Sequence, residues 1–363
     1  MRDGYVVPSE RKKILLLSDD FRNCSGVATI SREIILSTVH RYNWVQIGAA
    51  IRSDFDSQEL DMSEKINEET GLTDASVKII TRNGYGDQAF LLQVLSREKP
   101  DAVFLFTDPR YWIWLFEMEQ EIRAKVPIIY LNIWDNLPYP FYNEPYYRSC
   151  DGLLAISKQT KNINEQVLGQ EAAKHVIRYI PHGVSSKYFP IENPSENVEY
   201  MRFRRKLRGK SKFVLLYNAR NLSRKQTGNL ILAWQQFCNT IGKDKAIECK
   251  LVCHTDIVDR AGTDLGAIYR DLCDNSYVKI DFIQQKFTTE CMNYLYNASD
   301  GVILVSSNEG WGLSLTEALM TGKMFIATVT GGMQDQMRFE DKQGNWIDFS
   351  EKFPSNHTGL FKD

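Results

Sequence analysis

The sequence predicts an α/β protein with two doubly wound domains, each built around a parallel β-sheet. Short apolar runs, typical of buried strands, alternate along the chain with longer amphipathic segments, which are typical of helices. This alternation favours strand–helix–strand units and therefore parallel sheets covered by helices. A length of 363 residues is enough for two domains with separate cores.

Seven apolar runs predict the strands of the first domain, which we place at residues 1–183. In chain order they are Lys13–Leu17, Trp44–Ala50, Val77–Ile80, Ala102–Phe106, Pro127–Ile133, Leu153–Ile156 and Val176–Ile180. Between the first two runs, Val27, Ile30 and Ile34 recur at helical spacing, so we expect a helix there. The same alternation predicts helices between later strands.

Residues 184–211 are expected to form a region between the two domains. Pro190 and Pro194 interrupt both the strand and the helix periodicity. The second half of the region is strongly basic, with Arg202, Arg204, Arg205, Lys206, Arg208, Lys210 and Lys212 in or beside it. This run predicts a solvated helix, with weak contact to an anionic membrane surface or another polyanion as the alternative.

Five further runs predict the strands of the second domain, at residues 212–363. They are Phe213–Tyr217, Lys250–Cys253, Tyr277–Ile283, Gly301–Val305 and Met324–Thr328.

Composition narrows the class of protein. The net charge of −2 gives no reason to expect nucleic-acid binding, and no apolar run reaches the roughly 18–20 residues that span a bilayer. The segment Met1–Lys13 lacks the apolar core of a signal peptide. Seven scattered cysteines favour free thiols in a reducing cytoplasm. Cys249 and Cys253 have no second Cys or His pair at zinc spacing, so we expect core packing and no metal site.

The most informative stretch is Glu309–Ala318, which follows the apolar run Gly301–Val305. It places Glu309 and Glu317 eight residues apart around a Gly-Trp-Gly turn. A strand that ends in a glycine turn and opens into a helix presents backbone N–H groups and a positive dipole end to a phosphate. The pattern predicts a nucleotide-sugar site with one carboxylate on the sugar and the other on the ribose. The alternative is an ordinary helix with acidic residues near its start.

The same stretch carries a family resemblance. The residues Ser306–Leu313, Glu317–Leu319, Gly322-Lys323, Ile326–Thr328 and Gly331-Gly332 closely resemble the donor-site signature of family-4 retaining glycosyltransferases, among the glycosyl transferases of group 1. The resemblance implies the GT-B fold, which has two facing Rossmann-like domains with parallel sheets and a cleft between them. It also implies that Glu317 binds the ribose and that Glu309 lies by the donor sugar as a catalytic residue. The amides that would meet the diphosphate are those of Gly310, Trp311, Gly312 and Leu313.

Two cations follow the run Phe213–Tyr217. Arg220 and Lys225 are similar in position to the family's Arg and Lys that meet the donor diphosphate, and Arg224 is a rival for either role. Fixed cations stabilise the departing diphosphate as the glycosidic bond breaks, so the resemblance implies neither a metal nor another cofactor. The alternative is a basic loop that faces solvent.

The first domain is expected to supply the acceptor side. The loop Ser18–Ala28 resembles the family's glycine-containing loop but retains only Gly26, so we expect Ser25 and the Gly26 amide to contact the acceptor without a tight phosphate cradle. Farther along, Trp134 stands where many relatives have a histidine, so no imidazole role is transferred. Its neighbour Asp135 is expected either to act on the acceptor as a catalytic residue or to cap the following turn.

Aromatic residues crowd the same edge, and we expect core packing for most, with stacking on sugar rings as the alternative. They are Tyr111, Trp112, Trp114, Phe116, Tyr139, Phe141, Tyr142, Tyr146 and Tyr147.

These residues predict a cytoplasmic, metal-independent enzyme that moves a sugar from a nucleotide-diphosphate sugar to a glycan, lipid or small-molecule acceptor, with retention of configuration. A GT-B phosphorylase or epimerase stays open within the same fold. A non-catalytic nucleotide- or sugar-binding protein stays open as another class. The chain stops at Asp363 without the closing helices usual in the family, so we expect a C-terminally truncated donor domain.

Overall fold

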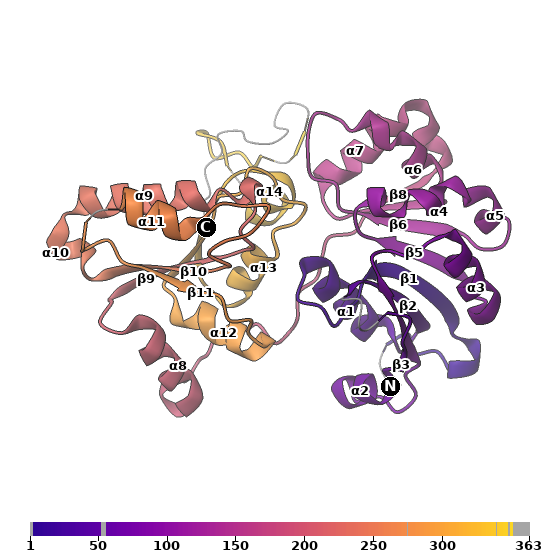
Figure 1. Ribbon diagram of the computed structural model, residues 1–363, viewed down its shortest axis with the longest axis horizontal. Helices are drawn as coiled ribbons and strands as arrows, with labels where there is room; N and C mark the ends of the chain where they lie inside the picture. Colours follow the sequence, from indigo (N-terminus) through magenta and orange to yellow (C-terminus); the bar gives the residue numbers. More distant parts are fainter. Residues whose placement is uncertain (1–2, 52–55, 274, 339, 348, 351–363) are drawn as a thin grey trace. The chain divides into compact units, whose positions relative to one another are not determined.

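The computed structural model describes residues 3–51, 56–273, 275–338, 340–347, 349 and 350 (Figure 1). The chain divides into two compact units, Met1–Gly183 and Val184–Asp363. Each unit carries a β-sheet flanked by helices, with its own buried hydrophobic core. The predicted α/β class, with two Rossmann-like units, is confirmed.

The first unit has an eight-stranded sheet in the order β3-β4-β2-β1-β5-β6-β7-β8, in which β3 alone is antiparallel to its neighbour. Its strands are β1 (Lys12–Asp19), β2 (Tyr42–Ile51), β3 (Glu59–Asp61), β4 (Val77–Asn83), β5 (Ala102–Phe106), β6 (Ile128–Asn132), β7 (Gly152–Ala155) and β8 (Val176–Tyr179). All seven predicted strands are present. The three-residue β3 was missed because it is too short to show a period.

The helices of the first unit are α1 (Gly26–Thr38), α2 (Ser63–Thr70), α3 (Gln88–Glu98), α4 (Ile113–Glu117), α5 (Glu119–Arg123), α6 (Glu144–Arg148) and α7 (Lys158–Leu168). Helix α1 packs on β1, and α7 packs on β7 and β8. On the central strand β1, the consecutive residues Leu15, Leu16 and Leu17 are all fully buried. A strand covered on both faces takes such an uninterrupted apolar run.

The second unit has a five-stranded parallel sheet in the order β11-β10-β9-β12-β13. Its strands are β9 (Phe213–Asn218), β10 (Cys249–His254), β11 (Ile280–Ile283), β12 (Gly301–Leu304) and β13 (Met324–Ala327). Its helices are α8 (Val198–Arg208), α9 (Thr227–Ile241), α10 (Lys243–Ala246), α11 (Leu265–Leu272), α12 (Thr289–Ala298), α13 (Leu313–Met320) and α14 (Gly331–Met337). Helices α9 and α11 lie on one face of this sheet and α12 lies on the other (Figure 1).

The strand order of the second unit fixes where a ligand site can form. From β9 the chain adds β10 and then β11 on one side, and afterwards crosses to add β12 and β13 on the other side. The loops that leave β9 and β12 therefore turn to opposite faces of the sheet. In open α/β sheets, ligands bind in the crevice that this divergence leaves at the carboxyl ends of the strands.

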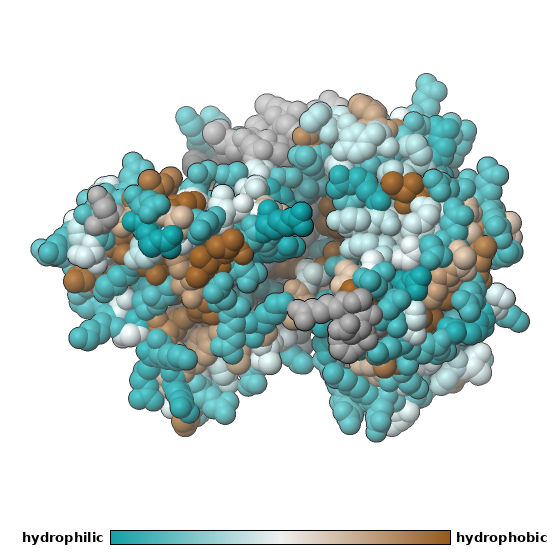
Figure 2. All heavy atoms as spheres, viewed as in Figure 1, coloured by the Kyte–Doolittle hydropathy of each residue, from teal (hydrophilic) through white to brown (hydrophobic). Residues whose placement is uncertain are grey.

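The basic segment within residues 184–211 forms α8 and packs as part of the second unit. The rings of Tyr200 and Tyr294 lie 5.6 Å apart, and Arg208 Nη1 donates to the carbonyl oxygen of Ala298 at 2.9 Å, which ties α8 to α12. The surface over α8, at the lower left of the space-filling view, is mainly hydrophilic (Figure 2). In the part of the chain that the structure describes, no helix is long and apolar enough to cross a membrane.

Candidate active site

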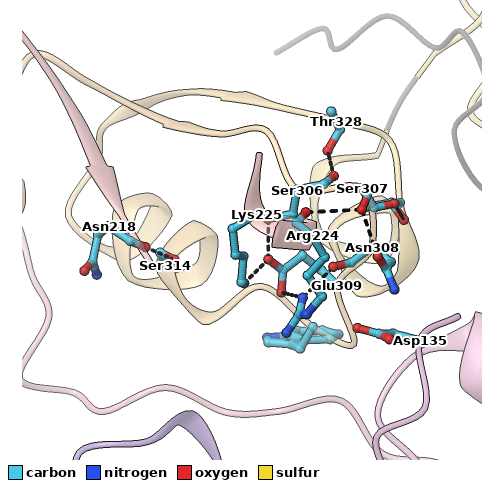
Figure 3. A network of polar contacts seen from close by, with 12 residues as sticks. Asp135, Asn218, Arg224, Lys225, Ser306, Ser307, Asn308, Glu309, Ser314 and Thr328 are labelled. Carbon is cyan, nitrogen blue, oxygen red and sulfur yellow. Dashed lines mark hydrogen bonds and ion pairs between the residues drawn. The ribbon is translucent and has the colours of Figure 1, made fainter. Parts of the chain in front are cut away.

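Two loops meet at the switch point of the second unit. One leaves β9 at Asn218 and passes through the short turn Ser223–Lys225, and the other leaves β12 and passes through Glu309 into α13. The backbone N–H of Ser307 donates to the carbonyl oxygen of Arg224 at 2.8 Å, and Arg224 Nη1 donates to the carbonyl oxygen of Asn308 at 2.6 Å. The two loops are thus fastened together where they diverge from the sheet (Figure 3).

Glu309 is the centre of this junction (Figure 3). The Lys225 ammonium forms an ion pair with its carboxylate, and Arg224 Nη1 lies 3.6 Å from its Oε2 atom. The Ser306 hydroxyl donates to Oε1 at 2.6 Å. The side chain of Glu309 is only 6 % exposed and that of Lys225 only 12 %. Two cations and one carboxylate carry a net charge of +1, which suits an anionic ligand.

The protonation of Glu309 follows from its neighbours. Burial by itself would raise the pKa of this carboxyl, but the charges of Lys225 and Arg224 and the hydrogen bonds from Lys225 and Ser306 outweigh burial and lower it. Glu309 is therefore ionised at neutral pH.

The glycine turn that follows opens into α13 without a side-chain cap among the described residues. Gly312 has φ +84°, in the left-handed region that favours glycine, and a Cβ atom there would lie 2.7 Å from Met333 Cγ. Gly332, at the start of α14, packs against the turn so closely that its Cβ would lie 2.5 Å from the carbonyl oxygen of Gly310. Glycine at both positions lets the turn bring the backbone of Gly310–Leu313 to the switch point.

The Trp311 side chain is part of the core under this turn. Its indole Nε1 donates to Thr316 Oγ1 at 2.9 Å, and Gln336 Nε2 donates to the Trp311 carbonyl oxygen at 2.6 Å. The residue is 8 % exposed. Trp311 was predicted as a donor-site residue. Its buried ring packs under the turn and stabilises it, so only its backbone N–H could contact a ligand.

Glu317 lies on the second turn of α13 in a separate hydrogen-bond network. The fully buried Tyr296 on α12 donates its hydroxyl proton to Glu317 Oε2 at 2.5 Å. Asn218 Nδ2 donates to the Tyr296 hydroxyl oxygen at 2.7 Å. Burial raises the pKa of Glu317 to about 7, although hydrogen bonds from Tyr296 and Tyr188 oppose the shift.

Arg220 does not join the Lys225–Glu309 pair. Its Nε atom lies 2.7 Å from Asp259 Oδ2, and its side chain is 65 % exposed. The second cation at Glu309 is Arg224, which the sequence offered as an alternative to Arg220 or Lys225. Arg220 nevertheless leaves the same strand end as Lys225, five residues earlier in the loop.

In the first unit, Ser25 is the N-cap of α1. Its Oγ atom accepts from the backbone N–H of Ala28 at 3.0 Å and donates to Asp19 Oδ2 at 2.8 Å. Gly26 is the exposed first residue of this 13-residue helix. Because β1 lies between β2 and β5, this helix start also stands at the switch point of its own sheet.

Asp135 follows β6 in the first unit and is half-buried. Gln159 Nε2 donates to its carbonyl oxygen at 3.1 Å, which holds the backbone against the start of α7. The neighbouring Trp134 ring stacks under the Arg110 guanidinium, with 5.2 Å between the guanidinium carbon and the ring centroid. At the position where many relatives have a histidine, this chain therefore has the ring of Trp134 packed against a guanidinium.

The aromatic residues of this edge divide into two groups. Trp112, Phe116 and Tyr147 are buried in the core, as expected for most. Tyr111, Phe141 and Tyr142 are instead 51 %, 62 % and 63 % exposed, and stacking on sugar rings stays a prediction for them.

A comparison with protein families gave one match, which lies in the second unit. Residues 201–353 match the family model described as Glycosyl transferases group 1. The match confirms the resemblance inferred from the Glu309–Ala318 stretch. A comparison with curated proteins gave no match.

Solved structures share the fold over most of the chain. Trehalose 6-phosphate synthase from Burkholderia multivorans is 12% identical, with a TM-score of 0.63 over 90% of this chain and 86% of its own. Sucrose-phosphate synthase from Thermosynechococcus elongatus is 15% identical, with a TM-score of 0.63 over 90% and 84%. An E. coli structure described as trehalose-6-phosphate bound with UDP-2-fluoro glucose is 11% identical, with a TM-score of 0.62 over 90% and 86%. These likenesses confirm the expected GT-B fold.

The structure brings together Lys225 and Glu309, with the glycine turn between Glu309 and α13. Asn218, Tyr296 and Ser306 also belong to the site but were not assigned a role from the sequence. A polar residue at the end of an apolar strand run was a usable signal for Asn218. Tyr296 carries no such signal, because an aromatic residue on an amphipathic helix is usually core.

Proposed function

We propose that this chain is a retaining, metal-independent glycosyltransferase that uses a nucleotide-diphosphate sugar. The observation that carries the proposal is the Lys225–Glu309–Arg224 cluster beside the uncapped start of α13, at the switch point of a group 1 glycosyl transferase domain. Cations and the backbone amides at a helix start together suit a diphosphate.

Each side chain then has a role. Lys225, with Arg220 and Arg224, holds the diphosphate, while the amides of the turn bind its oxygens. An ammonium group has three N–H donors, so Lys225 can contact a phosphate and Glu309 at the same time. Glu317 accepts from the ribose, and Glu309 binds a hydroxyl of the donor sugar.

The reaction proposed is a front-face displacement. The bond between the anomeric carbon and the leaving phosphate oxygen breaks, and the acceptor oxygen bonds to the carbon on the same face. The acceptor proton passes to the departing phosphate oxygen, and a nucleoside diphosphate leaves. Charge grows on this diphosphate in the transition state, where fixed cations stabilise it most. On the acceptor side we assign Ser25, the Gly26 amide and Asp135.

The neighbours suggest which substrates to test first. One is bound with a UDP-glucose analogue, and two are named as synthases of sugar phosphates. We therefore propose UDP-glucose as the first donor and glucose 6-phosphate, with which a similar synthase from Burkholderia xenovorans is in complex, as the first acceptor.

Product analysis tests the proposal. The purified chain is incubated with UDP-, ADP- and GDP-sugars, with and without acceptors, and separately with α-glucosides and inorganic phosphate, and the products are resolved by NMR of the anomeric proton. A new glycosidic bond with the donor's configuration supports it. A free sugar 1-phosphate would indicate a phosphorylase, an altered free sugar would indicate an epimerase, and nucleotide binding without turnover would indicate a binding protein.

A further inference from the structure

The carboxylate of Glu317 lies against two buried tyrosine residues. Tyr296 is 0 % exposed, and its hydroxyl donates to Glu317 Oε2 at 2.5 Å. Tyr188, which is 8 % exposed, packs edge-on against Tyr296 with 5.9 Å between ring centroids. An ionised carboxylate accepts about four hydrogen bonds, so these contacts leave capacity for hydroxyl groups of a ligand.

The direction of the Tyr296 hydroxyl is set by its second partner. Asn218 Nδ2 lies 2.7 Å from the hydroxyl oxygen and can only donate. When Glu317 is ionised and can only accept, the single hydroxyl proton of Tyr296 must therefore point at Glu317. Asn218 thereby decides which way Tyr296 donates.

Asn218 is fixed in turn from two sides. Its Oδ1 atom lies 2.8 Å from His254 Nδ1, and its backbone carbonyl oxygen accepts from the Ser314 hydroxyl at 2.9 Å. Ser314 belongs to the first turn of α13, the helix that carries Glu317 (Figure 3). His254 Nε2 lies 2.9 Å from the carbonyl oxygen of Gln285, and its ring stacks on Phe287. The chain of contacts thus runs from β10 through the end of β9 to α12 and α13.

We propose that Tyr296 and Asn218 are positioning residues that orient Glu317 toward a ribose hydroxyl and so set a preference for ribonucleotides over deoxyribonucleotides. The inference rests on the proposed function, in which Glu317 meets the ribose. A carboxylate discriminates between a hydroxyl and a hydrogen only while its lone pairs are aimed at the hydroxyl. The hydrogen bonds from Asn218 to Tyr296 and from Tyr296 to Glu317 hold the carboxylate in that orientation.

The test is the ratio of affinities for a nucleoside diphosphate and its 2′-deoxy and 3′-deoxy counterparts. Calorimetric titration first establishes which of UDP, ADP and GDP the wild-type protein binds best. Loss of a hydrogen bond to a charged group is expected to make the deoxy form bind on the order of 10-fold more weakly. In Tyr296→Phe the ratio is expected to fall to within about threefold of one, since the phenyl ring keeps the packing but cannot donate.

A matched control lies on the same helix. Tyr294 donates its hydroxyl to Glu290 Oε1 at 3.1 Å, away from Glu317, so Tyr294→Phe is expected to keep the wild-type ratio. Asn218→Ala provides a second variant at a half-buried position and is expected to lower the ratio as well. A general loss of stability would weaken ribose and deoxyribose forms equally and would not move the ratio.

The outcomes distinguish the positioning role of Tyr296 and Asn218 from the proposed function on which it rests. Wild-type discrimination that survives Tyr296→Phe, or that falls equally in Tyr294→Phe, overturns the positioning role while the proposed function stands. Wild-type binding without discrimination overturns the assignment of Glu317 to the ribose and this inference with it. If the wild-type protein binds none of the three diphosphates, the proposed function itself is contradicted.

Discussion

In the proposed function, the ion pair between Lys225 and Glu309 serves ligand binding as well as folding, and the two roles can be separated. Both side chains are almost buried, so removing Lys225 leaves the Glu309 carboxylate with the more distant and more exposed Arg224 as its counter-charge. Lys225→Met is expected to lower the free energy of unfolding by about 3 kcal/mol, measured by urea denaturation. The double variant Lys225→Met/Glu309→Gln is expected to recover most of that loss without recovering nucleoside diphosphate affinity.

A matched control for this pair is the exposed ion pair of Lys212 and Glu248 in the same unit, whose side chains are 74 % and 44 % exposed. Lys212→Met is expected to change stability by less than about 1 kcal/mol. A double variant that binds diphosphate as tightly as the wild type would show that Lys225 has only a structural role.

Arg220 is expected to act on the ligand and hardly on the fold, because its partner Asp259 holds it at the surface. Arg220→Ala should weaken UDP binding roughly 10-fold while leaving the affinity for uridine unchanged, since only the diphosphate carries the charge that Arg220 meets. The change in unfolding free energy should stay within about 1 kcal/mol. Equal losses for UDP and uridine would argue against a phosphate contact.

The raised pKa of Glu317 makes stability depend on pH. Burial shifts this pKa from 4.5 to about 7, so between these values the native state binds more protons than the unfolded state. Stability from this group is therefore present below about pH 4.5 and is lost as pH rises through 7. The loss amounts to about 3 kcal/mol.

Glu317→Gln removes this titration. The variant should melt at nearly the wild-type temperature at pH 5 and several degrees above it at pH 8, measured by differential scanning fluorimetry. Glu309 contributes in the opposite sense, since its lowered pKa makes its contribution fade as pH falls, but it cancels in the comparison. A difference in melting temperature that is constant with pH would contradict the raised pKa.

Among the elements, the turn between β12 and α13 depends most on glycine. A Cβ atom at Gly332 would lie 2.5 Å from the carbonyl oxygen of Gly310 and 2.6 Å from Trp311 Cα, both backbone atoms that cannot move aside alone. Gly332→Ala is therefore expected to displace the turn, lower the melting temperature by several degrees and abolish diphosphate binding.

Gly183→Ala is the matched control, since a Cβ atom at Gly183 meets nothing within 4 Å. It should melt within about one degree of the wild type. Normal diphosphate binding by Gly332→Ala would mean that the turn does not shape the site.

Among the helices and strands, the strand positions were the easiest to predict from the sequence. The run Phe213–Tyr217 became β9 with one further residue, because buried parallel strands are apolar throughout. Tyr277–Ile283 was predicted too long, and β11 begins only at Ile280. The apolar character of Tyr277 and Val278 reflects burial before the strand and carries no information about hydrogen bonding between strands.

For the whole molecule, the two Rossmann-like units and the location of the glycine turn between β12 and α13 followed from the sequence, because both depend on local patterns. The partners within the site did not. Arg220, Arg224 and Lys225 lie in one loop, and nothing in their order says that Arg224 turns to Glu309 while Arg220 turns to Asp259. Tyr296 joins Glu317 from 21 residues away, on a helix whose pattern indicates only core packing.

The central claim is that the switch point of the second unit binds a nucleoside diphosphate through Lys225. It is tested most directly by calorimetric titration of the wild-type chain and of Lys225→Met/Glu309→Gln with UDP, ADP and GDP. We predict that the wild type binds at least one of them and that the double variant, although folded, binds it at least about 100-fold more weakly. Equal affinity in the two proteins, or no binding by the wild type, would contradict the account.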